Sequence, residues 1–262
     1  MAPPTLQPPS HATLKPTPLT RPSFSPFGTA IIPPLPRTLT TPPIPLSSHP
    51  RDTHVPEPVA ANQLSALKYS PISPLTDTYG TSKSGVPSEG RLSMFSCFPR
   101  TLRKPAGGNE GEKKERSVFD IRILERHPYT TQTFSPLGLS ASESNPETYF
   151  LVIVAPTLKG QTAIATTESG EKVTIQDPPD LGNVKAFVAR GDQAVTYGAG
   201  TWHAPMVVLG KSRVDFLVVQ FVNGVGEEDC QEVSVGEGVV VQVEGQGGCE
   251  NFGLWEKKRA KL

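Results

Sequence analysis

The second half of the chain is a succession of short apolar runs with the length and spacing of β-strands. Gly, Pro, Asn or Asp separates the runs, and none shows the 3.6-residue period of an amphipathic helix. They are residues 119–127, 149–154, 184–189, 193–197, 214–222 and 239–243. Because the intervals between them lack strong helical patterns, the sequence does not favour βαβ crossovers. The pattern predicts an all-β antiparallel sandwich or barrel, most simply a jelly roll, with the continuously apolar run 149–154 covered on both faces.

The first part of the chain is dominated by proline, which limits regular structure there. Seventeen of the 29 prolines precede residue 60. We predict a disordered Pro-rich tail over residues 1–13 and one domain over residues 14–262, with loop insertions near 70–90 and 104–116. Phe24 and Phe27 are expected to dock on the domain, and residues 30–32 to form a short edge strand. The segments expected to form a helical turn are residues 62–69 and the C-terminal stretch.

Charge and cysteine usage restrict the partners and the location. Lys and Arg total 25, as do Asp and Glu, so no excess charge favours nucleic acid or an anionic membrane. No apolar run approaches a membrane span, and no signal peptide is recognisable. The odd set of three cysteines (Cys97, Cys230 and Cys249) indicates free thiols in a reducing compartment. We therefore expect a cytoplasmic protein or, since Ala260-Lys261-Leu262 is similar to the S-K-L address, a peroxisomal one.

The run 119–127 carries the first candidate functional groups. Read as a single strand, it places its odd-numbered residues on one face, which ends in Glu125 and His127, and its even-numbered residues in solvent. A carboxylate aimed into a core persists only when it is paired, hydrogen-bonded or bound to a metal. Alternatively, the strand leaves the core at residue 125, and both groups lie at a wet rim.

A second polar segment is Tyr197-Gly-Ala-Gly-Thr-Trp-His203. Its glycines do not form a dinucleotide-binding loop, because the sixth position is His203 and no helical pattern follows. Two glycines beside a Trp and a His instead predict a tight turn that delivers aromatic groups into a pocket.

Together the two segments are similar to the paired motifs of cupin jelly rolls. Glu125, His127 and Gln132 take places of the first motif, and His203 takes the histidine place of the second. Two imidazoles, a carboxylate and an amide can hold a divalent transition metal. A metal-free pocket that uses the same groups as acid and base is the other interpretation.

Longer stretches resemble one family. Ile123-Leu-Glu-Arg-His-Pro-Tyr-Thr-Thr-Gln-Thr-Phe-Ser-Pro-Leu137 resembles the signature of ureidoglycolate lyases. Other family motifs follow in family order, at residues 24–28, 62–63, 66–69, 95–100, 151–156, 184–188, 200–205 and 216–221. Two departures occur: the family's Asn-Gln-Gly-Thr is Asn62-Gln-Leu-Ser65 here, and Gln220 stands where an acidic residue is common.

The resemblance implies a cupin-like enzyme that eliminates urea from (S)-ureidoglycolate to give glyoxylate in purine catabolism. His127 and His203 would be base and acid or metal ligands, Gln132 would orient the substrate, and Glu125 would set a His tautomer or ligate. Lys68 would hold the substrate carboxylate. Tyr197 and Trp202 would wall the pocket or fill the core.

Two other functions stay open beside this one. The chain could be another cupin-type enzyme acting on a small hydroxy acid or sugar acid, or an inactive jelly-roll binding module. A homodimer is expected, since jelly rolls with exposed edges often pair.

Overall fold

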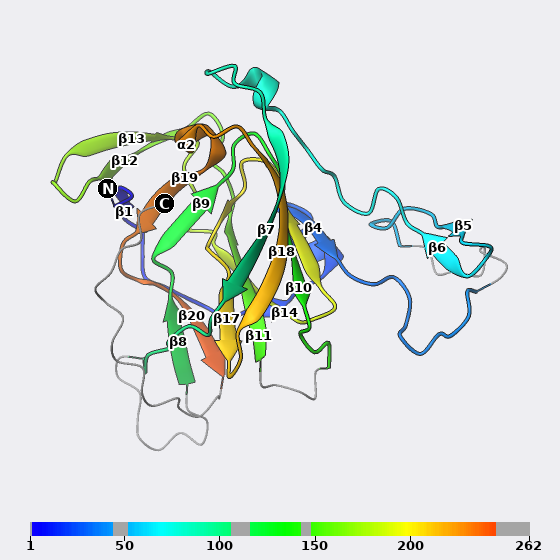
Figure 1. Cartoon of the computed structure of the whole chain (residues 1–262). Helices are drawn as coiled ribbons and strands as arrows, with labels where there is room; N and C mark the ends of the chain where they lie inside the picture. The colour runs from blue at the N-terminus through cyan, green and yellow to red at the C-terminus, as the bar shows by residue number, and fades with distance from the viewer. Residues whose placement is uncertain (1, 44–51, 106–115, 143–147, 245–262) are drawn as a thin grey trace.

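The computed structural model describes residues 2–43, 52–105, 116–142 and 148–244, and these fold almost entirely into β-strands. Figure 1 shows the strands gathered into a body from which one hairpin projects. Among the described residues, the helices are single turns: α1 (Arg21–Phe24), α2 (Gly226–Asp229) and the 3-10 turn Tyr79–Thr81. None of these helices has the length or apolar character needed to cross a bilayer. The predicted all-β fold is confirmed.

Two large sheets form the body. The ten-stranded sheet runs, in order, β13 (Lys172–Gln176), β12 (Thr162–Thr166), β1 (Thr5–Leu6), β19 (Gln231–Val235), β9 (Ile123–Arg126), β16 (Trp202–His203), β11 (Thr148–Ala155), β14 (Lys185–Ala189) and β3 (Thr17–Pro18), with β17 (Val207–Gly210) also paired to β11. The five-stranded sheet runs β4 (Gly28–Ile31), β15 (Ala194–Tyr197), β10 (Gln132–Leu137), β18 (Val214–Val222) and β7 (Glu89–Cys97).

Smaller sheets complete the fold. One joins β2 (Ala12–Leu14), β20 (Val239–Glu244) and β8 (Arg116–Asp120), and the other is the hairpin of β5 (Val59–Ala61) and β6 (Ala66–Lys68). Most of the predicted strands are present, and the predicted edge strand at residues 30–32 is β4, which begins two residues earlier. The expected C-terminal helical turn, Cys249 and the tail Ala260-Lys261-Leu262 lie outside the described residues.

β11 is the central strand of the core, and both of its faces are buried. Leu151 and Ile153 belong to one apolar cluster, on the outer side of the large sheet. Phe150, Val152 and Val154 belong to a second cluster, in which the two large sheets pack on each other. The same cluster holds Phe24 and Phe27, which dock on the domain as expected. The burial of both faces of β11 confirms that an uninterrupted apolar run is a strand covered on both sides.

The predicted disordered tail at residues 1–13 is ordered where the structure describes it. β1 pairs with β12 and β19, and β2 pairs with β20. Leu6 is buried in the outer cluster. Proline composition alone misleads here, because prolines at strand ends leave the intervening residues free to join a sheet.

Residues 62–69, expected to form a helical turn, instead form the end of the projecting β5–β6 hairpin. Ala60 pairs with Leu67, and the intervening Asn62, Gln63 and Leu64 all have positive φ angles. Leu64 has a φ of 70° and is 60% exposed. It occupies the position at which the family motif has glycine, the residue that adopts this conformation without steric cost.

Replacing Leu64 with glycine is therefore expected to stabilise the hairpin by about 0.5–1 kcal/mol. The left-handed backbone conformation costs an L-residue about 1–2 kcal/mol, which glycine avoids. The greater conformational entropy of glycine in the unfolded chain offsets part of this gain. Slower amide hydrogen exchange over residues 59–68 would report the gain. A Leu64→Ala control keeps the Cβ and should show no slowing. Equal exchange in all three proteins would contradict the strain assigned to this turn.

Candidate active site

The run that carries Glu125 and His127 is two strands rather than one. β8 ends at Asp120 and β9 begins at Ile123, in a different sheet. Leu124 and Arg126, predicted to be solvated, are therefore buried. Arg126 tolerates burial because its guanidinium donates to Gln231 Oε1 and to two backbone carbonyls, at 2.8–2.9 Å, and lies over the Trp202 ring.

Neighbouring strands bring the two predicted histidines together. His203 pairs with Glu125 between β16 and β9, and its Nε2 lies 3.4 Å from Glu125 Oε1. The imidazole of His127 follows at the end of β9, with its ring centroid 5.5 Å from that of His203. Both histidines are buried, whereas the Glu125 side chain is 19% exposed. The inward interpretation of Glu125 and His127 is therefore correct.

Backbone carbonyls orient both imidazoles in the same way. His127 Nδ1 lies 2.6 Å from the Asp229 carbonyl, and His203 Nδ1 lies 3.0 Å from the Thr201 carbonyl. A carbonyl only accepts, so each Nδ1 carries a proton, and each ring, when it is neutral, has its lone pair at Nε2. Among the described residues neither Nε2 has a hydrogen-bond partner, although both are buried.

Burial and mutual charge determine the protonation of these groups. Burial and the charge of His203 lower the pKa of His127, which favours its neutral form at neutral pH. Burial raises the pKa of the Glu125 carboxyl, but the close contact with His203, at 3.4 Å, and the positive charge that His203 and His127 carry when protonated outweigh it. The pKa of Glu125 therefore lies below its ordinary value, and the carboxylate is ionised.

A row of side chains from the five-stranded sheet covers the cluster. Tyr197, Gln132 and Gln220 are register partners, so they share one face of the sheet. The Tyr197 ring stacks on His203, with centroids 3.9 Å apart. Gln132 Nε2 donates to Gln220 Oε1 at 2.5 Å, which leaves Gln132 Oε1 without a described partner. Gln220, at a position where an acidic residue is common in the family, thus still supplies a hydrogen-bond acceptor.

The donor set fits a divalent transition metal. Glu125, His127 and His203 each offer one ligand atom, and these atoms lie within 4.8 Å of one another. An ionised carboxylate and a lone pair repel each other at 3.4 Å, so either a cation or a proton on His203 must lie between them. Two buried, unpartnered Nε2 atoms are typical of histidine ligands whose other nitrogen is fixed by a carbonyl.

Sequence comparison agrees with this geometry. The profile of the family described as ureidoglycolate lyase matches residues 11–242. The chain belongs to the ureidoglycolate lyase family. It is 37% identical to the ureidoglycolate lyase of Schizosaccharomyces pombe over 66% of this chain and 75% of that protein. The Saccharomyces cerevisiae ureidoglycolate lyase is 36% identical over 69% and 80%, and that of Pseudomonas paraeruginosa 30% over 79% and 82%.

Two predicted site residues of this ureidoglycolate lyase family member lie away from the cluster. Trp202 precedes His203 on β16, so its ring points to the opposite face, into the outer apolar cluster. Its Nε1 donates to the Asp177 carbonyl at 2.9 Å. Lys68 lies on β6 in the projecting hairpin, which Figure 1 shows well apart from β9.

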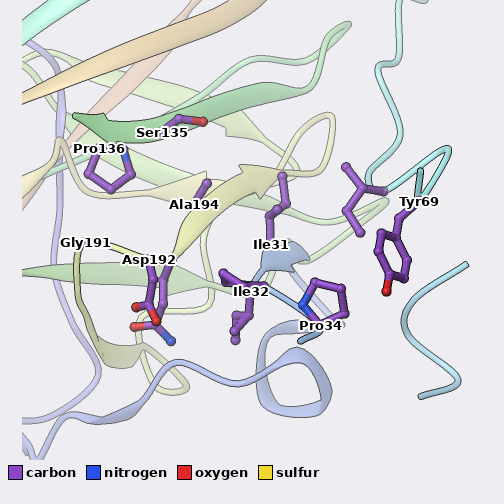
Figure 2. A pocket seen from close by; sticks show the side chains of 12 residues that line it. Ile31, Ile32, Pro34, Tyr69, Ser135, Pro136, Gly191, Asp192 and Ala194 are labelled. Atoms are coloured by element: carbon purple, nitrogen blue, oxygen red, sulfur yellow. The ribbon is translucent and has the colours of Figure 1, made fainter. Parts of the chain in front are cut away.

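A groove of about 400 Å³ lies on the opposite face of the five-stranded sheet. Figure 2 shows Ile31, Ser135 and Ala194 turned toward it, with Tyr69 at its far side. None of the predicted site residues lines this groove, although Tyr69 and Ser135, which do line it, belong to stretches that resemble family motifs.

Asp229 was not predicted as a site residue, although its carbonyl orients His127. No side-chain pattern could have indicated it, because the functional atom belongs to the backbone. Gln220 was noticed only as a departure from the family motif, and its contact with Gln132 follows from the pairing of β10 with β18.

Proposed function

We propose that this chain eliminates urea from (S)-ureidoglycolate and leaves glyoxylate. The convergence of Glu125, His127 and His203 under Tyr197 and Gln132 is the observation that supports the proposal. The substrate carbon carries a hydroxyl, a carboxylate and a ureido nitrogen. Removal of the hydroxyl proton lets the carbonyl form while the carbon–nitrogen bond breaks. The leaving nitrogen takes up a proton, so the reaction needs no net proton and no covalent nucleophile.

Glu125, His127 and His203 are the residues that would hold a divalent metal. Such a metal would act as a Lewis acid toward the substrate hydroxyl, lowering its pKa. Gln132 Oε1 faces the cluster as an acceptor suited to a ureido N–H. Burial, and then the charge of Glu125, raise the pKa of Tyr197 far above its ordinary value, so its hydroxyl stays protonated and can donate to the substrate.

The purified protein should therefore release urea from (S)-ureidoglycolate but not from the (R) enantiomer. Sugar acids and other small hydroxy acids serve as the comparison substrates, because another cupin-type enzyme would turn one of these over instead. Failure to release urea from ureidoglycolate would overturn the proposal, and a protein that only binds it would be the inactive module.

The substrate carboxylate has two candidate anchors. Arg91 pairs with Gln220 between β7 and β18, which places it on the same face as Gln132, two strands away. Its contact with Glu89, at 2.9 Å, is an exposed ion pair and therefore weak. Lys68, the anchor predicted from its motif, would have to reach a site from the projecting hairpin.

Exchanging each cation for methionine separates these anchors. We expect Arg91→Met to raise KM for ureidoglycolate about tenfold with little change in kcat, because the lost contact is made equally in the ground and transition states. Lys68→Met is the matched variant. A raised KM in the lysine variant alone would assign the anchor to Lys68.

We further infer a homodimer. β7 is an edge strand on which Leu92 and Met94 are 68% and 56% exposed. Such an edge favours association unless it is covered. Light scattering should report a dimer for the natural chain and a monomer for the double variant Leu92→Asp, Met94→Asp. A monomer for both would contradict this inference.

For the location, we propose the peroxisome on the basis of Ala260-Lys261-Leu262, with the cytoplasm as the alternative. A fluorescent protein fused to the N-terminus should give puncta that disappear when Leu262 is deleted. Diffuse fluorescence of the full chain would favour the cytoplasm.

A further inference from the structure

The segment between β6 and β7 was predicted as a loop insertion, and the structure places it against the active site. Thr78 N donates to the Tyr129 carbonyl at 2.8 Å, and Asp77 forms a β-bridge with Thr130. Thr76 N donates to Thr131 Oγ1 at 2.9 Å. The segment is therefore fixed along the short connection that joins His127 to Gln132.

Tyr79 is the residue of this segment that enters the interior. It is 1% exposed, and its ring packs on Tyr129 with centroids 5.5 Å apart. Its hydroxyl donates to Asp229 Oδ1 at 2.7 Å. This is a charge-assisted hydrogen bond in a partly buried place, where such bonds are stronger than in water.

Asp229 connects this contact to the catalytic cluster. Its carboxylate also accepts from the backbone N–H of Asn223 and of Gly224, both at 2.8 Å. Its own carbonyl accepts the Nδ1 proton of His127 at 2.6 Å. One residue thus receives the Tyr79 hydroxyl through its side chain and orients the imidazole through its backbone.

A second contact clamps the same turn to the same segment. Glu228 accepts from Ser84 N at 2.8 Å and from Ser84 Oγ at 2.6 Å, and Asn223 Nδ2 donates to it at 2.7 Å. The hydrogen bond from the Ser84 hydroxyl, with that from Asn223, outweighs burial and lowers the pKa of Glu228 to about 2. The clamp therefore stays ionised over the working range of pH.

We propose that Tyr79 is a positioning residue for His127. Its hydrogen bond holds the Asp229 carbonyl in place, and that carbonyl keeps the proton of His127 on Nδ1 and its Nε2 lone pair aimed at Glu125 and His203. The catalytic consequence rests on the proposed lyase function, whereas the orientation of the imidazole does not. Partners of this kind around metal-ligating histidines typically change affinity or activity 10–100-fold.

The variant Tyr79→Phe removes the hydroxyl and keeps the ring. Histidine-selective ¹⁵N NMR of the metal-free protein measures the tautomer of each imidazole. The His127 ring should be protonated at Nδ1 in the natural chain and should become a mixture of tautomers in the variant. Affinity for Co²⁺, measured by calorimetry, should fall about tenfold. Tyr149→Phe is the matched control, because Tyr149 is a partly buried tyrosine on β11 outside this network.

Unchanged histidine resonances and Co²⁺ affinity within twofold in Tyr79→Phe would overturn the proposal. If that variant does not fold, Glu228→Gln loosens the same turn without touching Tyr79 and should give a smaller shift in the same direction. No change in Glu228→Gln would then overturn it. Neither readout uses ureidoglycolate, so a protein that releases no urea but shows the tautomer shift contradicts the lyase proposal and not this one.

Discussion

Replacing His203 or His127 with alanine is expected to lower urea release from (S)-ureidoglycolate by about a thousandfold or more, within the range that acid–base and metal-ligating residues supply. Each change removes one of the unpartnered Nε2 atoms that face Glu125. The steady-state rate of urea formation measures the effect, and circular dichroism establishes that the variant is folded.

His54 provides the control for the alanine exchange. It is an exposed histidine whose imidazole contacts Asp52, and His54→Ala should retain the natural rate. Near-normal turnover by a folded His203→Ala or His127→Ala protein would reject the role assigned to that histidine.

Removing divalent metal is expected to have a comparably large effect. Prolonged dialysis against a chelator should reduce the rate at least about a hundredfold, since three ligands would be left around an unfilled centre with an ionised carboxylate beside two lone pairs. Adding back Mn²⁺, Co²⁺, Ni²⁺ or Zn²⁺ one at a time should restore activity for at least one of them.

Elemental analysis of the chelated protein makes this result decisive. Full activity in protein shown to be free of metal would contradict metal ligation. The two histidines would then act as base and acid, with a proton on His203 bridging to Glu125. Loss of activity that no added metal restores would point to damage by chelation, which the unfolding temperature of the same sample detects.

The sequence determines those features that depend on local pattern. The apolar run at residues 149–154 could only be a strand buried on both sides, and β11 is one. Glu125 and His127 share a face because side chains alternate along a strand, which holds within β9 even though the longer strand is broken. His203 could be paired with them because the cupin-like spacing fixes the order of the motifs.

Other features depend on partners that no local pattern specifies. The break between β8 and β9 arises because the two strands pair in different sheets. β16 has only two residues, and its pairing with β9 and β11 decides which of them points to the cluster. His203 does, so Trp202 faces the core. The turn at Asn62 folds as a hairpin against its helical propensity because β5 and β6 pair on either side of it. Tyr79 and Asp229 are 150 residues apart, so their hydrogen bond could not be predicted without the fold.

The central claim is that the cluster under Tyr197 and Gln132 eliminates urea from ureidoglycolate. The contrasting reaction is hydrolysis of the ureido group, which would release ammonia. Measuring urea, glyoxylate and ammonia in one reaction mixture tests it most directly. We predict urea and glyoxylate in equal amounts with no ammonia from the natural chain, and neither product above background from His203→Ala. Ammonia in place of urea, or equal product from both proteins, would contradict this account.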